Sequence, residues 1–333
     1  MNNKSAEIKR YLNVIKRASA YIESLLENDD DGLLEQMINV PKDSPKIVQE
    51  IAPPPPIIIE PKFVPPEQSK AHEEARKKHV ADLLAIDCWP ESILSSIANK
   101  KPSDQDQMHR ANAVLDTMLD RSVDGLKFLD YGCGEGWMAQ EICKRGVAES
   151  WAYDHQANAR WSSLNGVKAI SSRDQFPKTN NYFDVIMLYD VLDHCEDPVE
   201  LMSHVKSCIS HTGVVYVRCH PWTSKHASHL FKHGLNKAYL HLFLNWSELK
   251  EIIKEDPLFT RPEKNAIEAY HWWFKDFEIK RERFIDEPVS QFFHVPAFKE
   301  LLASEQQIPL SEIDKFLKLM EIQFVNYCLV PKK

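Results

Sequence analysis

The placement of glycine most constrains how this chain can fold. Only nine of its 333 residues are glycine, yet Gly132, Gly134 and Gly136 fall within five positions. They follow an apolar segment at 127–130, and a helical pattern begins near Trp137. A residue without a Cβ atom lets a ligand lie against the backbone. The segment is therefore predicted to be a strand, a ligand-binding loop and a helix.

Short apolar segments alternate with helical stretches from residue 127 onward, which is typical of a parallel sheet with crossover helices. We expect helices at 138–145, 158–164 and 198–210, and a longer helical stretch at 289–320. The predicted fold is an α/β, doubly wound, mostly parallel sheet of seven strands, the last one antiparallel. The expected strands are 127–130, 150–153, 167–170, 183–189, 214–219, 277–284 and 322–329.

The N-terminal part of the chain has a different character. Residues 1–52 carry helical hydrophobic spacing and predict a helical module, either a hairpin packed on its own domain or a unit for oligomerisation or docking. Seven prolines within 53–66 forbid a helix and predict an extended linker. A helical lead-in is expected at 67–115. The main domain is expected at 116–333, with a helical insertion at about 221–276.

Composition excludes several classes of protein. With 41 Lys and Arg against 49 Asp and Glu, the net charge is −8, which argues against a generally basic nucleic-acid-binding surface. No apolar run approaches the roughly 20 residues of a membrane span, and no secretory segment is expected at the start. Seven cysteines without paired spacing predict no disulfide framework, so a cytoplasmic location is expected.

A carboxylate follows the second predicted strand. Asp154 comes eighteen residues after Gly136, and an Asp at that strand end can accept hydrogen bonds from both hydroxyls of a ribose. The glycines have the spacing G-x-G-x-G, whereas the dinucleotide fold uses G-x-G-x-x-G. Together the loop and the acid indicate a binding site rather than a turn followed by a helix cap.

Asp130-x-Gly132-x-Gly134-x-Gly136 resembles the first motif of class I S-adenosylmethionine-dependent methyltransferases. Residues 182–194, which read Tyr-Phe-Asp-Val-Ile-Met-Leu-Tyr-Asp-Val-Leu-Asp-His, resemble that family's fourth-strand segment. Residues 197–201 and 213–217 resemble the helix and strand that follow. The resemblance is close over 124–219 and looser beyond. It implies a Rossmann-like methyltransferase with S-adenosyl-L-methionine as its cofactor.

The resemblance also implies roles for individual residues. Asp130 would lie near the amino group of the cofactor, and Asp154 would bind the ribose hydroxyls. The loop would approach the methionine part of the cofactor. The further cofactor-binding residues predicted here are Gly132, Cys133, Gly134, Gly136 and His155.

One departure from the family pattern concerns the adenine. The family often has an Asp near the end of the third strand, where this chain has Ser172 and Arg173. We expect these two residues to line the adenine, with Asp174 as the alternative partner. Tyr189 and Asp190 would line the site beyond the fourth strand.

A stretch without acidic residues, 201–247, carries half of the fourteen histidines. Its lysines predict a basic surface for an anionic acceptor, unless they form a solvated helix face. His220 directly follows the fifth strand and is the predicted general base, the alternative being a structural histidine. Trp222, Lys225 and His226 are the predicted substrate-binding residues. No metal site is expected, because no cysteine pair or carboxylate completes the histidines at helical spacing.

Signatures of some nucleic-acid methyltransferases are missing. No Asp/Asn-Pro-Pro-Tyr/Phe follows the fourth strand, and no Pro-Cys pair offers a nucleophile for cytosine methylation. We therefore expect transfer to oxygen or nitrogen of a polar, anionic acceptor such as a nucleotide, a nucleic-acid end or a sugar derivative. The alternatives are a neutral metabolite, or a methyltransferase fold retained as a structural or assembly component. The N-terminal helices are expected to bind a second copy or another protein.

Overall fold

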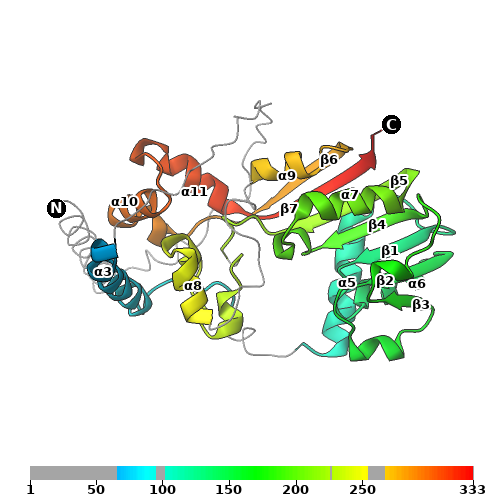
Figure 1. The fold of residues 1–333 in the computed structure, drawn as a ribbon, viewed down its shortest axis with the longest axis horizontal. Helices are drawn as coiled ribbons and strands as arrows, with labels where there is room; N and C mark the ends of the chain where they lie inside the picture. Colours follow the sequence, from blue (N-terminus) through cyan, green and yellow to red (C-terminus); the bar gives the residue numbers. More distant parts are fainter. Residues whose placement is uncertain (1–65, 95–101, 226, 254–266, 333) are drawn as a thin grey trace, which may run out of the picture. The chain divides into compact units, whose positions relative to one another are not determined.

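The computed structural model describes residues 66–94, 102–225, 227–253 and 267–332 (Figure 1). The predicted helical module at 1–52 lies outside the described residues, as does the linker at 53–66 except for its last residue. The described residues divide into two compact units. Unit 1 takes its residues from 1–92, 237–254 and 288–318, and unit 2 from 93–236, 255–287 and 319–333.

Unit 2 is built on one seven-stranded sheet with the strand order β3-β2-β1-β4-β5-β7-β6. Neighbouring strands are parallel from β3 to β5, and β7 runs antiparallel to both β5 and β6. The predicted seven-stranded, mostly parallel fold is confirmed, with β1 inside the sheet. The strands are β1 (Lys127–Tyr131), β2 (Glu149–Tyr153), β3 (Val167–Ile170), β4 (Phe183–Tyr189), β5 (Ile209–Cys219), β6 (Phe277–Asp286) and β7 (Ile322–Pro331).

Helices cover both faces of this sheet, as a doubly wound fold requires. On one face, apolar residues of α5 (Asp104–Met118) and α6 (Trp137–Cys143) pack on alternate residues of β1, β4 and β5. On the other face, α7 (Pro198–Cys208) and α9 (Ile267–Trp273) pack on the intervening strand residues, whose side chains point to the opposite side of the sheet. Because β4 is covered on both faces, it is apolar along most of its length rather than alternating.

The helix boundaries follow local signals. Ser103 caps α5 by accepting a hydrogen bond from the amide of Asp106, whose carboxylate accepts one from the Ser103 amide at 2.9 Å. Asp197 caps α7, and Pro198 occupies its first turn. The helix predicted at 158–164 is a short 3-10 helix, η1 (Ala159–Ser163).

The helical stretch predicted at 289–320 is interrupted. It consists of η7 (Gln291–His294), α10 (Pro296–Glu305), η8 (Leu310–Glu312) and α11 (Ile313–Glu321). Pro296 begins α10, and Pro309 precedes η8, because proline lacks the amide that would continue a preceding helix. The predicted insertion at 221–276 contains η4 (Leu230–His233), η5 (Leu240–Phe243), α8 (Trp246–Ile253) and α9.

Unit 1 is helical and brings together segments that are distant in sequence. Trp89 lies at the centre of its core, with ring centroids 5.3 Å from Phe243 and 5.6 Å from Phe298. The indole of Trp89 donates a hydrogen bond to the Ala238 carbonyl at 2.7 Å. Residues 237–254 and 288–318, which the sequence placed within the domain at 116–333, therefore group with helix α3 (Pro66–Leu84).

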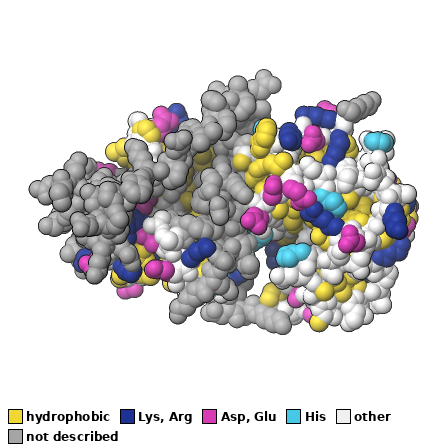
Figure 2. Space-filling model, in the orientation of Figure 1, with side chains coloured by type: hydrophobic (Ala, Val, Ile, Leu, Met, Phe, Trp, Pro, Cys, Tyr) yellow, Lys and Arg dark blue, Asp and Glu magenta, His cyan; other side chains and the backbone are white. Residues whose placement is uncertain are grey.

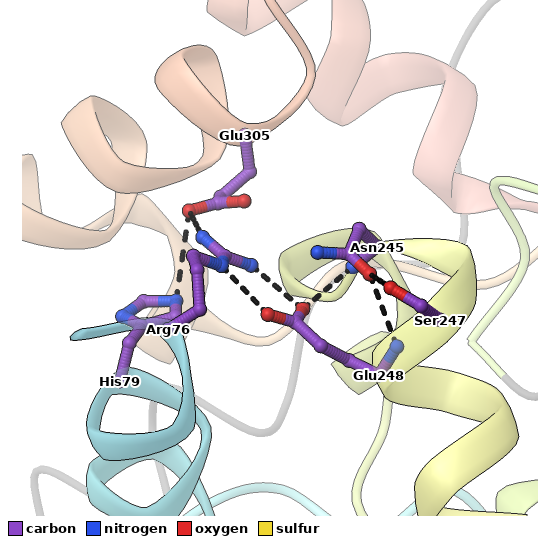
Figure 3. Close-up of polar contacts among 6 residues, drawn as sticks. All are labelled: Arg76, His79, Asn245, Ser247, Glu248 and Glu305. Atoms are coloured by element: carbon purple, nitrogen blue, oxygen red, sulfur yellow. Dashed lines mark hydrogen bonds and ion pairs between the residues drawn. The ribbon is translucent and has the colours of Figure 1, made fainter. Parts of the chain in front are cut away.

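A partly buried ionic cluster joins three helices of unit 1 (Figure 3). Arg76 on α3 donates to both oxygens of Glu248 on α8 at 2.7 Å and to Glu305 on α10 at 2.6 Å. His79 Nε2 lies 3.6 Å from the same Glu305 oxygen, and burial lowers the pKa of His79 to about 4. Glu248 also accepts the Asn245 amide at 2.8 Å, which fixes the start of α8. One guanidinium thus holds two carboxylates together.

None of the helices in the described ranges combines the length and the apolar character needed to cross a membrane.

Candidate functional site

Most of the predicted site residues of unit 2 lie where parallel strands end at one edge of the sheet. Asp130 on β1 is opposite Ala152 on β2 and Met187 on β4. Tyr189, the last residue of β4, is opposite Arg218 on β5. The turns after these four strands therefore adjoin, which is where open α/β sheets bind their ligands.

All three glycines of the loop after β1 have positive φ angles, +78°, +51° and +77°. A Cβ atom on Gly132 would lie 2.4 Å from Cγ2 of Val191, in the turn after β4. A Cβ on Gly134 would meet no atom within 4 Å. Gly132 is therefore required by close packing against the next turn, whereas Gly134 borders open space in which a ligand can lie against the backbone.

Asp154 is bonded to this loop. Its Oδ2 accepts a hydrogen bond from the Gly134 amide at 2.9 Å, and its Oδ1 accepts one from the Gln156 amide at 3.1 Å. The exposed ring of His155 lies 3.2 Å from Oδ1. The Asp154 side chain remains 16% exposed, so its carboxylate has both an anchor and access to a ligand. The loop and the acid that the sequence paired are one structural unit.

Asp130 is a buried carboxylate with an unsatisfied oxygen. Its Oδ2 accepts a hydrogen bond from the Ala139 amide at 3.3 Å, while its Oδ1 has no hydrogen-bond partner among the described residues. Burial, with a smaller contribution from the nearby charge of Asp154, raises the pKa of Asp130 to about 7. A carboxylate with an unmet acceptor next to an open loop fits a cationic group such as a ligand ammonium.

The Cys133 side chain faces the protein interior. It packs against Ala139 and Ala152, and its amide donates to the Tyr153 carbonyl at 3.0 Å. Burial raises the pKa of the Cys133 thiol, so it stays protonated. Only the backbone of this residue is in a position to meet a ligand.

The three residues predicted to line the adenine follow β3, but they differ in orientation. Ser172 caps η2 (Arg173–Gln175), and its hydroxyl accepts the Asp174 amide at 3.3 Å. Arg173 is bound by Glu200 of α7, with Nη2 at 3.0 Å from Oε2, and this hydrogen bond raises its pKa. The guanidinium of Arg173 thus ties η2 to α7, which leaves Ser172 and Asp174 as the residues at the strand end.

A polar cluster forms where β4 and β5 end. Arg110 of α5 donates to the Tyr189 hydroxyl at 3.1 Å and lies 3.8 Å from Asp190 Oδ2. Asp190 has a left-handed backbone with φ of +52°, and its amide donates to the Arg218 carbonyl at 2.8 Å. Its buried Oδ1 accepts no hydrogen bond from any described residue and lies 4.0 Å from His220 Nε2. The predicted base thus faces the Asp190 carboxylate.

His220 is buried. Its Nδ1 lies 2.9 Å from the Gln323 carbonyl, which can only accept, so Nδ1 carries the proton of the neutral ring. The ring packs against Phe324 with centroids 4.0 Å apart. Burial lowers the pKa of His220 to about 3. At neutral pH the imidazole is therefore uncharged, with the lone pair of Nε2 on the side of Asp190.

Two lysines of the acid-free stretch 201–247 meet acceptors from other parts of the chain. Lys225 forms an ion pair with Glu287 at 2.5 and 2.6 Å, and Lys206 donates to the Asp276 carbonyl at 3.1 Å. Trp222 is buried, and His226 lies outside the described residues. Basic, acidic and histidine side chains are interspersed on the surface in view in Figure 2. The stretch contains no acidic residue itself, but the fold brings acidic residues and carbonyl groups from other segments to its lysines.

Sequence reasoning missed Arg110 and Asp193, and it included Arg218 and Lys232 only among the cations of the predicted basic surface, not as individual site residues. Arg218 lies over the ring of Phe324, with Cζ 3.8 Å from the centroid, and 5.5 Å from that of Tyr189. Arg218 and Lys232 belong to the acid-free stretch, which was the available signal. Arg110 precedes Tyr189 by 79 residues, and no local pattern links them.

Within the described ranges, no group of three or more His, Cys, Asp or Glu side chains is arranged to hold a metal ion.

Comparisons with known proteins place this geometry in context. A family model described as "Methyltransferase domain" matches residues 104–302. The ubiquinone biosynthesis O-methyltransferase of Parvibaculum lavamentivorans is 24% identical over 114 residues, which are 32% of this chain and 45% of that protein. The enzyme of the same name from Aeromonas salmonicida is 25% identical over 121 residues, 33% of this chain and 51% of the other. The chain thus spans about half the length of these relatives.

Among solved structures, an S-adenosylmethionine-dependent methyltransferase from Mesorhizobium loti is similar to this chain. It shares 16% sequence identity with a TM-score of 0.40, over 65% of this chain and 95% of that one.

Proposed function

The chain belongs to the methyltransferase domain family, as its resemblance to S-adenosylmethionine-dependent methyltransferases predicted, and we propose that it methylates a hydroxyl oxygen of a small, polar, anionic acceptor. The observation that carries this proposal is the juxtaposition of Asp130, Gly134 and Asp154. A buried carboxylate with an unmet oxygen, an open glycine backbone and a second, accessible carboxylate meet at one sheet edge.

These residues fit S-adenosylmethionine, whose sulfonium supplies an electrophilic methyl group. Asp130 Oδ1 would accept the ammonium of its methionine part, and the Gly134 backbone would lie beneath that part. Each carboxylate oxygen of Asp154 accepts one backbone amide and has a further lone pair, with which it would accept a hydrogen bond from a ribose hydroxyl. Ser172 and Asp174 would border the adenine, since Arg173 is bound to Glu200.

Oxygen is the proposed acceptor atom because both curated relatives described above are named O-methyltransferases. We place the acceptor hydroxyl beside His220 Nε2, which would take its proton, while Asp190 at 4.0 Å would stabilise the resulting imidazolium. A histidine whose pKa is lowered to about 3 is a weak base. It matches an acidic hydroxyl, such as a phenol, much better than an aliphatic alcohol.

Titration calorimetry with S-adenosylmethionine tests the cofactor site. The intact protein should bind it, and Asp154→Ala should weaken binding at least tenfold, because losing a charged hydrogen-bond partner costs about 1.5 kcal/mol or more. Asp116→Ala, which removes an exposed carboxylate from α5, is the control and should bind normally. An intact protein that does not bind the cofactor would instead support the structural or assembly role.

Single-turnover transfer of a tritiated methyl group tests the proposed base. His220→Asn should slow transfer by roughly 10²-fold or more while cofactor affinity stays unchanged, because general-base catalysis contributes about that much. His211→Asn, at an exposed histidine, is the control. An unchanged rate in His220→Asn would return this residue to a structural role.

We also propose that residues 1–65 mediate association with a second copy or another protein. The proline-rich composition before α3 supports a separate module. Deleting these residues should leave cofactor affinity unchanged and should reduce the number of chains in each sedimenting particle. Loss of cofactor binding in the truncated protein would contradict this separation.

A further inference from the structure

Positive charge is in excess where β4 and β5 end. Arg110 and Arg218 both lie beside Tyr189, with each Cζ 5.5 Å from its ring centroid. Arg110 lies 3.8 Å from the Asp190 carboxylate, whereas Arg218 has no carboxylate partner among the described residues. The positive charge of Arg218 is therefore left without an equal negative charge beside it.

Arg218 is the best-defined of these cations. Its guanidinium lies beside two aromatic rings, with Cζ 3.8 Å from the Phe324 centroid and 5.5 Å from that of Tyr189. The Arg218 Nε is buried and has no hydrogen-bond partner among the described residues. Asn326, directly opposite on β7, has a buried Oδ1 that likewise bonds to none of them. A held arginine with an unmet donor indicates a ligand.

The second arginine approaches the same tyrosine from α5. Arg110 Cζ lies 5.5 Å from the Tyr189 ring centroid, the same distance as Arg218 Cζ. The Arg110 side chain is 60% exposed, so it is available to a molecule arriving from solvent. Tyr189 is thus flanked by two guanidinium groups, one held inside and one at the surface.

This arginine pair adjoins the cofactor loop. A Cβ on Gly132 would touch Val191, which directly follows Asp190. Asp190 bonds to the backbone of Arg218, and its side chain faces His220. A small molecule held by the arginines would therefore lie next to both the proposed base and the proposed methionine site.

We propose that Arg110 and Arg218 bind a carboxylate of the methyl acceptor, so that the acceptor is a small aromatic hydroxy acid. This inference rests on the proposed function and names the substrate class. The planar edge of a guanidinium matches a carboxylate in a bidentate arrangement. The neutral, weakly basic imidazole of His220 suits a phenol hydroxyl, so the acid would be aromatic.

The local charge favours a singly charged group over a phosphate dianion. Asp190 lies 3.8 Å from Arg110 and balances part of its charge, and it would repel a second negative charge on the ligand. Arg218 is left with one uncompensated positive charge, which a monoanionic carboxylate matches. A singly charged carboxylate distinguishes this acceptor from the nucleotides and nucleic-acid ends that the sequence had allowed.

A matched pair of ligands tests the proposal. 3,4-Dihydroxybenzoate and 3,4-dihydroxybenzamide offer the same hydroxyls but differ in charge. Calorimetry on the full chain should show the acid binding at least tenfold more tightly, and methyl transfer should favour it by a similar factor in kcat/KM. Equal binding of the amide, or no binding of the acid, would overturn the proposal, and tighter binding of 3,4-dihydroxyphenyl phosphate would overturn the carboxylate assignment.

Variants then locate the contact. Arg218→Gln and Arg110→Gln should each remove most of the preference for the acid, whereas Arg218→Lys should keep part of it. Lys168→Gln, which removes an exposed cation paired with Glu149, is the control and should keep the full preference. Calorimetry measures binding of the acid without methyl transfer. A failure of the acid to bind can therefore be told apart from a failure of the protein to bind S-adenosylmethionine. A preference that survives both glutamine variants would refute the assignment to these arginines.

Discussion

Replacing Gly132 with alanine tests how tightly the cofactor loop is packed against the turn after β4. Two costs add. An alanine at φ of +78° carries about 1–2 kcal/mol of backbone strain. Its Cβ would lie 2.4 Å from Val191 Cγ2 and 3.0 Å from Cγ1, and overpacking of this kind costs about 1–3 kcal/mol. We expect Gly132→Ala to lower the free energy of unfolding by about 2–5 kcal/mol.

A double-mutant cycle separates the two costs. Val191→Ala removes both γ carbons and leaves only the Val191 Cβ, 3.3 Å from the added methyl group. In a Val191→Ala background, Gly132→Ala should therefore cost only the backbone strain, a coupling of about 1–3 kcal/mol. Urea unfolding of the full chain, followed for the transition that Gly132→Ala shifts, measures all four proteins.

Gly134→Ala is the matched control. Its Cβ meets no atom within 4 Å, so the cost should be about 1–2 kcal/mol of strain, and Val191→Ala should not relieve it. Cofactor affinity should nevertheless fall, because the methyl group would occupy the open side of the loop. If Val191→Ala reduced the destabilisation by both glycine substitutions equally, or by neither, then Gly132 would not be packed against Val191 as described.

Three further predictions follow from buried charges. The pKa of Asp130 is about 7 in the folded protein and 3.8 in the unfolded chain. Its contribution to the free energy of unfolding is therefore present below pH 4 and is lost as the pH rises to 7. Asp130→Asn should abolish this pH dependence of the free energy of unfolding in urea titrations at several pH values. Because a bound ammonium favours the charged carboxylate, wild-type affinity for S-adenosylmethionine should rise with pH up to about 7 in calorimetry, and that of Asp130→Asn should stay flat. Arg76→Gln leaves Glu248 and Glu305 buried without their cation and should destabilise unit 1 by about 3–5 kcal/mol in thermal unfolding, whereas Lys315→Gln, at an exposed pair, should cost under about 1 kcal/mol.

Features that depend on neighbours in sequence could be predicted. The apolar and alternating segments predicted all seven strands, because both covered strands such as β4 and half-exposed edge strands such as β6 have their own local patterns. The loop after β1 was recognised from Gly132, Gly134 and Gly136. All three adopt positive φ angles, which glycine reaches without the steric cost that other residues pay. Asp154 was recognised because the strand-to-strand spacing of this fold is regular.

Local pattern failed where helices are interrupted or where short segments turn. The stretch at 289–320 carries helical spacing, but Pro296 and Pro309 divide it. The segment at 158–164 forms the 3-10 helix η1 instead of an α-helix, and Asn158 caps it by accepting the Arg160 amide.

Charge partners were decided by the tertiary structure. Lys225 lies in an acid-free stretch, yet the fold brings Glu287 to it across 62 residues. Arg110 meets Tyr189 across 79 residues, and Arg76 meets Glu305 across 229. Such pairs depend on strand order and crossovers, which no window of sequence contains. The sequence by itself therefore determined the strands and the glycine loop, while the tertiary structure decided which charges are satisfied, because Coulomb interactions depend on distance in space and on burial.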